Sequence, residues 1–192
     1  MINSPEDVIS AELGPHEKLL WAGRPRQGIV FQRFDFFLVP FSLLWFGMAI
    51  VMTIEIVSAG EPIGLLIGGL FLLVGFYVAI GRLLIDARQR RNIFYGVTSD
   101  RIIIIAGLFS RTTKSLTLDT LADLSLTEKR NGSGFITFGT IPPWFMWFGY
   151  YGGGGWPGME MVPCFDLDGN AREIFEIIRA AQRNAKLAVR AS

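Results

Sequence analysis

The amino-acid sequence predicts a membrane-embedded helical hairpin followed by an antiparallel β-rich domain that ends in one helix. Three observations lead to this fold class. Two uncharged apolar runs occupy residues 36–54 and 63–80. Short β-branched and aromatic runs, separated by turn residues, follow from residue 93 onward. An apolar stripe with helical spacing lies close to the C-terminus.

Each apolar run is long enough to cross a bilayer. A helix rises 1.5 Å per residue, so about 20 residues cover the roughly 30 Å hydrocarbon core. The connection from Val57 to Pro62 has room only for a tight turn, so the two helices are expected to be antiparallel. The competing interpretation is a pair of buried helices in a soluble protein. Arginines flanking both runs disfavour that interpretation in so small a chain.

Basic residues outside the two runs set the expected orientation. Cytoplasmic loops of membrane proteins are enriched in Lys and Arg. The turn contains Glu61, follows closely on Glu55 and has no basic residue. Both termini are therefore expected to be cytoplasmic. The residues assigned to topology and to the membrane interface are Arg33, Arg82, Arg88, Arg90 and Arg91.

Small residues mark one face of the second run. Gly64, Gly68, Gly75 and Ala79 fall on one helical face together with Arg82. Small residues let helix backbones approach closely in lipid. Two interpretations stay open for this helix-packing face: contact with the first run, or a seam for another membrane protein. The Arg82 side chain is expected to snorkel to the membrane interface.

The sequence after residue 91 predicts a series of strands and turns. Asn131-Gly132 is a strong hairpin signal, because both residues tolerate positive φ. Residues 18–22 are a further strand candidate. A helix is predicted from about residue 171, with Asp168 or Asn170 as its cap. Strands are predicted at residues 93–98, 101–106, 116–118, 124–129, 135–138 and 161–167.

Three segments resemble those of the bacterial pleckstrin-homology-like (PH-like) membrane proteins. They are EKLLWAGRP at 17–25, FYGVTSDRIIIIAGLFSR at 94–111 and AREIFEIIRAAQ at 171–182. The resemblance implies a seven-stranded antiparallel PH-like β-roll, capped by a C-terminal helix, and no enzymatic activity. The expected division is a cytoplasmic N-terminal segment at 1–33, a transmembrane hairpin at 34–86 and a cytoplasmic PH-like domain at 92–187.

Eukaryotic PH domains that bind phosphoinositides use basic residues around the first strand-to-strand connection. The sequence places that connection at Ser99-Asp100, where Arg101 is the only basic neighbour. Phosphoinositide binding is therefore not expected here.

An uncharged stretch from residue 131 to 159 overlaps an aromatic and glycine-rich insertion at 140–160. Three interpretations stay open. The aromatic residues complete the core of the roll, insert shallowly at the membrane interface, or act as buried anchors on a protein partner. The candidate partner-binding residues are Trp144, Phe145, Trp147, Phe148, Tyr150, Tyr151 and Trp156.

Composition excludes several functional classes. A single cysteine, Cys164, rules out an internal disulfide, and one cysteine with one histidine rules out a Cys/His zinc site. A histidine-based triad would depend on His16, which is expected to be a solvated surface residue. A net charge of +1 without a basic stripe argues against nucleic acid. No metal, cofactor or catalytic residue is expected.

The expected function is that of a non-catalytic protein of the bacterial inner membrane. Its hairpin would anchor an interaction module that binds another membrane protein or complex, as an accessory or assembly subunit. The alternative is a module for phospholipid head groups or envelope homeostasis, acting through Arg88, Arg90 and Arg91.

Overall fold

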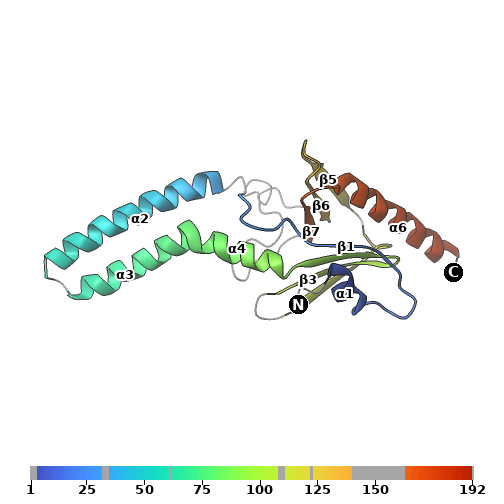
Figure 1. Cartoon of the computed structure of the whole chain (residues 1–192), viewed down its shortest axis with the longest axis horizontal. Coiled ribbons are helices and arrows are strands. Elements are labelled where there is room, and N and C mark those ends of the chain that lie inside the picture. Colours follow the sequence, from blue (N-terminus) through green and yellow to red (C-terminus); the bar gives the residue numbers. More distant parts are fainter. Residues whose placement is uncertain are drawn as a thin grey trace.

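Two long helices project side by side from a β-roll in the computed structural model of the chain (Figure 1). The structure describes residues 4–31, 35–60, 62–107, 111–121, 123–139 and 163–191. The first helix of the hairpin is α2, Asp35–Ser58. The second consists of α3, Pro62–Phe76, a π-helical turn η1, Tyr77–Gly81, and α4, Arg82–Arg91.

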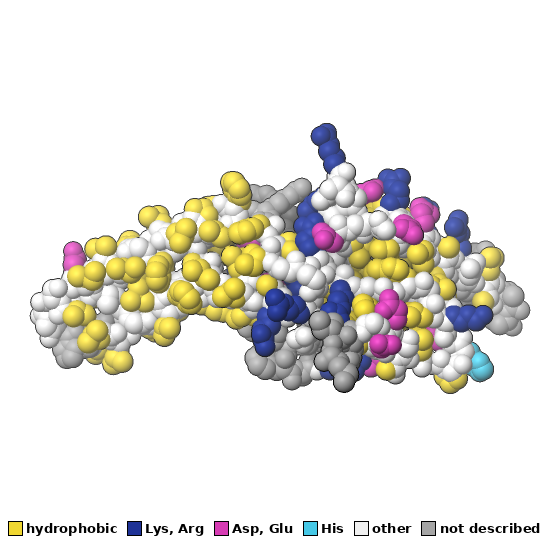
Figure 2. Space-filling view, viewed as in Figure 1, with side chains coloured by type: hydrophobic (Ala, Val, Ile, Leu, Met, Phe, Trp, Pro, Cys, Tyr) yellow, Lys and Arg dark blue, Asp and Glu magenta, His cyan; other side chains and the backbone are white. Residues whose placement is uncertain are grey.

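The hairpin buries very little of its apolar surface. In the most apolar 18-residue window, 11% of α2 and 22% of the second helix is buried. Both helices are long and apolar enough to span a membrane. Hydrophobic side chains cover the visible face of the hairpin, whereas charged side chains are concentrated on the roll (Figure 2). The low burial does not fit the interpretation of two core helices in a soluble protein, because core helices would be mostly buried.

The roll consists of two antiparallel sheets and a closing helix, as predicted. The first sheet has the order β1-β2-β3-β4 and the second has the order β5-β6-β7. The last helix, α6, packs its apolar stripe against the core of the roll. The bounds are β1 Leu19–Gly23, β2 Phe94–Thr98, β3 Arg101–Ala106, β4 Thr112–Thr117, β5 Leu124–Glu128, β6 Gly134–Phe138, β7 Cys164–Leu167 and α6 Ala171–Ala191.

The strand candidate at residues 18–22 is confirmed as β1. It pairs with β2 in antiparallel register, with Trp21 opposite Val97. The entire hairpin is therefore inserted between the first two strands of the roll. The assignment of Ser99-Asp100 as the first strand-to-strand connection is wrong, because that turn joins β2 to β3. The first connection runs from residue 24 to residue 93.

The predicted strand at residues 116–118 is displaced. The observed β4 begins at Thr112, and Leu118 lies just beyond it in the core, fully buried. This edge strand is exposed and consists mostly of polar residues. Its first residues therefore show no alternation of apolar and polar residues from which its start could be predicted. The strand predicted from residue 161 is described from Cys164 onward.

The isoleucine run of β3 is buried on both faces. Ile102 and Ile104 face the core of the roll. Ile103 packs on the opposite face against Ile9 of a short helix, α1, Pro5–Ser10. This second cluster explains why the run lacks the alternation of a half-exposed strand. Sequence analysis did not predict α1.

Candidate functional site

Three charged residues of α4 lie inside the protein at the base of the hairpin. Arg82, Asp86 and Arg90 are only 4%, 6% and 2% exposed. Their spacing of four residues places them along one stripe of the helix. Buried charges are costly unless paired, so the partners of this stripe decide how the hairpin is held.

The partners come from both sides of the stem. An Arg82 Nη2 group donates to the carboxylate of Asp35, the first residue of α2. The Arg90 Nε group donates to Asp86 at 2.8 Å, and its Nη1 group donates to Asp166 of β7. Charges of alternating sign thus connect the first membrane helix to the second and the second to the roll.

Backbone and amide contacts complete this junction. The Gln27 side chain donates to the Arg90 carbonyl at 3.0 Å and to the Pro25 carbonyl at 2.8 Å. The Arg26 N–H donates to the Asp166 carbonyl at 3.1 Å. The Asp166 N–H donates to the Tyr95 hydroxyl oxygen at 3.4 Å. Residues 25–27, just after β1, are therefore fixed to the same point as α4 and β7.

The π-helical turn precedes this stripe directly. The Arg82 N–H bonds to the Tyr77 carbonyl, which is the five-residue step of a π-helix. One extra residue in a helix rotates everything after it by about 100°. This turn consequently sets the direction in which Arg82 and the rest of α4 point. Period-based sequence analysis cannot detect such an insertion.

The junction also affects the pKa of Asp166 in β7. Burial raises the pKa of Asp166, while the Arg90 guanidinium favours its ionised form. Removing one member of a buried ion pair typically costs about 3–5 kcal/mol, because the other charge stays buried without compensation. The arrangement holds the hairpin and the roll in one relative orientation.

A second charged cluster fastens the N-terminal segment to the turn between β2 and β3. The Glu17 carboxylate accepts from Arg101 Nε at 2.8 Å, from the Thr98 hydroxyl at 2.6 Å and from the Gly14 N–H at 2.9 Å. Burial acts to raise the Glu17 pKa, but these hydrogen bonds outweigh it and lower the pKa to about 2. Arg101 also donates to the Glu12 carbonyl at 2.9 Å.

The small-residue face of the second membrane helix lies against α2. A Cβ atom on Gly68 would lie 2.4 Å from the Thr53 hydroxyl oxygen, and one on Gly75 would lie 2.9 Å from the Phe46 ring. Ala79, further along, is 6% exposed. The described residues of this face therefore pack against α2 of the same hairpin. The side-chain surroundings of Gly64 lie outside the described residues.

The predicted topology arginines have different environments. Arg88 and Arg91 are exposed at the end of α4. Arg82 does not reach outward as expected, because it is buried against Asp35. Arg90 is equally buried, so it cannot contribute to a head-group site. Arg33 lies outside the described residues.

The aromatic and glycine-rich insertion at 140–160 lies outside the described residues, as do all seven candidate partner-binding residues. Sequence analysis missed the acidic members of the junction. Asp35, Asp86 and Asp166 are separated widely along the chain, and only the four-residue steps from Arg82 to Asp86 and from Asp86 to Arg90 are local signals.

Residues 38–151 match a family model described as Bacterial PH domain. The match begins inside α2 and covers more than half of the 192 residues. The chain belongs to this family. In this bacterial PH domain protein the matched range includes most of α2, the whole of the second helix, and β2 to β6. Comparisons with curated proteins and with solved structures gave no match.

Proposed function

We propose that this bacterial PH domain protein is a membrane-anchored, non-catalytic interaction module. Its hairpin crosses the bacterial inner membrane twice, and its roll binds a protein partner as an accessory or assembly subunit of a larger membrane complex. One observation carries the anchoring: α2 and the second helix present their apolar side chains outward, with Phe36 91% and Leu66 77% exposed. So large an apolar surface is unfavourable in contact with water.

The pairing of β1 with β2 supports a double crossing. The two strands flank the hairpin in sequence, yet they share one sheet. They must therefore lie on the same side of any membrane that the hairpin enters. A hairpin that passes across and returns satisfies this requirement, whereas a single crossing does not.

Charge distribution supports a cytoplasmic roll. Arg88 and Arg91 are exposed at the roll end of the hairpin, and Glu55 lies near its turn. Basic residues next to membrane spans are retained in the cytoplasm. The roll and both chain ends are accordingly assigned to the cytoplasmic face.

The environment of the two most reactive side-chain types supports a non-catalytic role. Cys164 is buried in β7, and burial raises the pKa of its thiol to about 12. A thiol in that state is a poor nucleophile. His16 is exposed in the segment before β1, remote in sequence from the junction.

Sequence composition supports a protein partner. The insertion at 140–160 contains three of the five tryptophans, and its first charged residue is Glu160. Tryptophan and tyrosine are the residues that most often dominate binding energy at protein interfaces. An aromatic segment without basic residues, on a cytoplasmic module, suits a protein surface better than an anionic lipid surface.

The test is extraction of the full chain in a mild detergent and identification of proteins that co-migrate in stoichiometric amounts. Replacing Trp144 and Trp147 with serine should abolish co-migration of the partner while the roll stays folded. The matched control replaces Lys129 and Arg130, both exposed, with serine and should retain the partner. A chain that migrates alone in native extracts contradicts the proposal.

Recognition of phospholipid head groups is the second candidate function. The corrected strand order favours it, because Arg24 and Arg26 directly follow β1 while Arg88 and Arg91 precede β2. The first strand-to-strand connection is therefore flanked by basic residues after all. Arg26 is paired with Asp168 at 3.1 Å, so Arg88 and Arg91 are the better candidates for lipid contact. This function would be favoured if phospholipid co-purifies with the native chain and no longer co-purifies when Arg88 and Arg91 are both replaced with glutamine.

A further inference from the structure

The buried charges at the base of the hairpin do not balance. Among the described residues, three aspartates and two arginines are buried there: Asp35, Asp86, Asp166, Arg82 and Arg90. Arg82 and Asp35 form one ion pair and neutralise each other. Arg90 alone faces the other two aspartates. The Asp–Arg–Asp triad of Asp86, Arg90 and Asp166 therefore has two carboxyl groups for one guanidinium.

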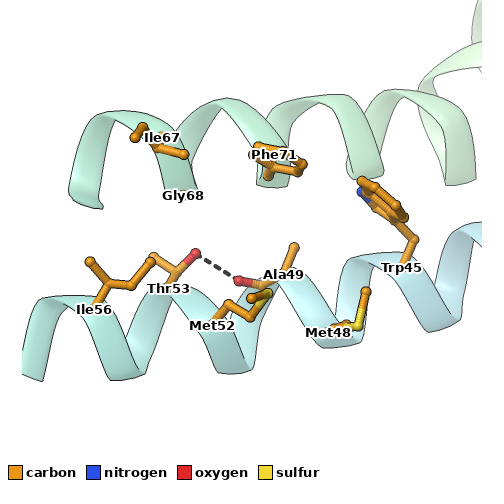
Figure 3. A pocket seen from close by; sticks show the side chains of 9 residues that line it. All are labelled: Trp45, Met48, Ala49, Met52, Thr53, Ile56, Ile67, Gly68 and Phe71. Atoms are coloured by element: carbon orange, nitrogen blue, oxygen red, sulfur yellow. Dashed lines mark hydrogen bonds between the residues drawn. The ribbon is translucent and has the colours of Figure 1, made fainter. Parts of the chain in front are cut away.

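The upper part of the hairpin has a different character. The nine residues that line the space between α2 and α3 include no charged side chain (Figure 3). The Thr53 hydroxyl among them donates to the Ala49 carbonyl of its own helix at 2.7 Å. Within the described residues, the charge imbalance is thus confined to the place where α4 meets β7.

Each carboxyl group of the triad uses only one of its oxygen atoms. Asp86 Oδ2 accepts from Arg90 Nε at 2.8 Å, and Asp166 Oδ2 accepts from Arg90 Nη1. The Oδ1 atoms of both aspartates are buried and accept no hydrogen bond from the described residues. An unpaired charge in such surroundings is costly, and a buried carboxylate relieves the cost by taking up a proton.

The nearby basic groups do not supply the missing counter-charge. Arg26, the next cation to act on the triad, is paired with Asp168 at 3.1 Å. Lys129 also acts on the triad, but it is exposed, so water screens its charge. Arg24 lies over the Phe94 ring, with its guanidinium carbon 4.7 Å from the ring centroid.

Neutral groups cannot balance the charge either. The Tyr95 hydroxyl of β2 and the Cys164 thiol of β7 also face the triad, and burial raises the pKa values of both. A water molecule can donate to the Oδ1 atoms and accept from Arg90 Nη2, but it leaves the excess negative charge in place. A proton removes the charge and turns one acceptor into a donor.

We propose that Asp86 and Asp166 share one proton, so that the triad is a neutral proton-binding site between the hairpin and the roll. The proton stays bound at about pH 6, where exposed carboxyl groups are ionised. Its release leaves one uncompensated negative charge between α4 and β7. The contact that fixes the hairpin on the roll is therefore sensitive to pH.

The expected pH dependence has a definite sign. Burial raises the pKa of Asp166 above its ordinary value of 3.8. The folded state therefore binds the proton more readily than the unfolded state does. The resulting stability is complete below about pH 4 and is lost as pH rises through the raised pKa. Glu17, with its pKa lowered to about 2, acts in the opposite direction and contributes equally at all pH values above about 5.

Infrared difference spectroscopy of the full chain in detergent tests the proposal without any substitution. At pH 6 the spectrum should contain the C=O stretch of a protonated carboxylic acid, with the intensity of one group per chain. The band should shift when the chain carries isotope-labelled aspartate, and it should disappear as the pH is raised. No band at pH 6, or a band that shifts only with labelled glutamate, overturns the proposal.

Two substitutions make the test specific to the triad. Asp86→Asn and Asp166→Asn each leave one carboxylate with the Arg90 guanidinium, so either change alone should abolish the band. Asp100→Asn, at an exposed carboxyl group, is the matched control and should leave the band unchanged. A band that survives in either triad variant shows that the proton is not shared and overturns the proposal.

Thermal unfolding between pH 5 and pH 8 gives an independent measurement. The unfolding temperature of the wild type should fall as the pH rises, because the folded state loses its extra proton. The Asp166→Asn variant should show no such fall, since its remaining carboxylate is already balanced by Arg90. An equal dependence on pH in the wild type and this variant overturns the proposal.

Discussion

Arg90 and Asp166 form a buried ion pair although they lie 76 positions apart in the sequence. Arg90 belongs to the stem that continues the second membrane helix, and Asp166 belongs to the last strand of the roll. The same guanidinium also holds Asp86 of its own helix at 2.8 Å. One side chain thus connects the hairpin to the roll, and both parts should lose order together when it is removed.

Replacing Arg90 with methionine should lower the free energy of unfolding by about 3–5 kcal/mol, because two buried carboxylates lose their counter-charge. Thermal unfolding of the detergent-solubilised protein measures this. The matched control, Arg91→Met, changes an exposed arginine next to it and should alter stability by no more than about 0.5 kcal/mol.

A triple replacement distinguishes pairing from packing at this site. Changing Asp86 and Asp166 to leucine along with Arg90→Met removes all three buried charges, so much of the lost stability should return. Equal stability losses in the Arg90 and Arg91 variants would show that the buried ion pairs do not hold the two parts together.

Gly96 of β2 makes room for α1. A Cβ atom at this position would lie 2.6 Å from a methyl carbon of Ile9, which is fully buried. Gly96→Ala should therefore cost about 1–3 kcal/mol, the usual effect of overpacking. Adding Ile9→Val should recover part of that loss. Gly169→Ala, at a position with nothing within 4 Å, is the control and should be close to neutral.

Two adjacent glycines of α3 test how the hairpin packs. Alanine at Gly68 would place its Cβ 2.4 Å from the Thr53 hydroxyl oxygen, whereas nothing lies within 4 Å of the same atom at Gly69. Gly68→Ala should destabilise the hairpin in spite of the better helix propensity of alanine, about 1 kcal/mol. Gly69→Ala should stabilise it or leave it unchanged. Identical unfolding temperatures for the two variants would contradict the observed packing.

Local patterns were enough to predict much of this fold. The apolar runs gave the hairpin, and alternation and turn signals gave β2, β3, β5 and β6, because those features depend on neighbours in sequence. The place of β1 in the sheet was only a weak candidate, since five residues carry little periodic signal. Long-range partners were not predictable: nothing near Arg82 or Arg90 indicates that Asp35 and Asp166 will meet them.

The candidate site shows the same limit. Counting arginines on each side of the spans gave an orientation, but it treated Arg82 and Arg90 as exposed. Their direction depends on the π-helical turn at Tyr77–Gly81 and on the return of β7 to the stem. Both features arise only in the folded chain, and neither produces a periodic pattern in the sequence.

The low pKa of Glu17 predicts a stability loss in acid. Its carboxyl group titrates near 4.5 when unfolded and at about 2 when folded. The unfolded state binds the proton more readily, so the contribution is complete above about pH 5 and is lost as pH falls toward 2. Glu17→Gln should lower stability by about 1–3 kcal/mol at pH 7 and flatten this acid dependence. Thermal unfolding from pH 7 down to pH 3 measures it.

Glu6→Gln is the matched control for the loss of one carboxylate, since Glu6 is exposed on α1. An equal loss of stability between pH 7 and pH 3 in the Glu17→Gln variant and in the wild type would contradict this account. That result would show that the hydrogen bonds to Arg101 and Thr98 do not stabilise the ionised carboxylate.

Cysteine accessibility tests the double crossing most directly. Native Cys164 is buried, so introduced cysteines can be followed against a low background. Ser58→Cys places a thiol at the turn end of α2, and Thr113→Cys places one on the exposed strand β4. In intact spheroplasts a membrane-impermeant maleimide should label residue 58 at once and residue 113 only after lysis. Labelling of both residues before lysis, or of neither, would contradict a hairpin that crosses the membrane and returns to a cytoplasmic roll.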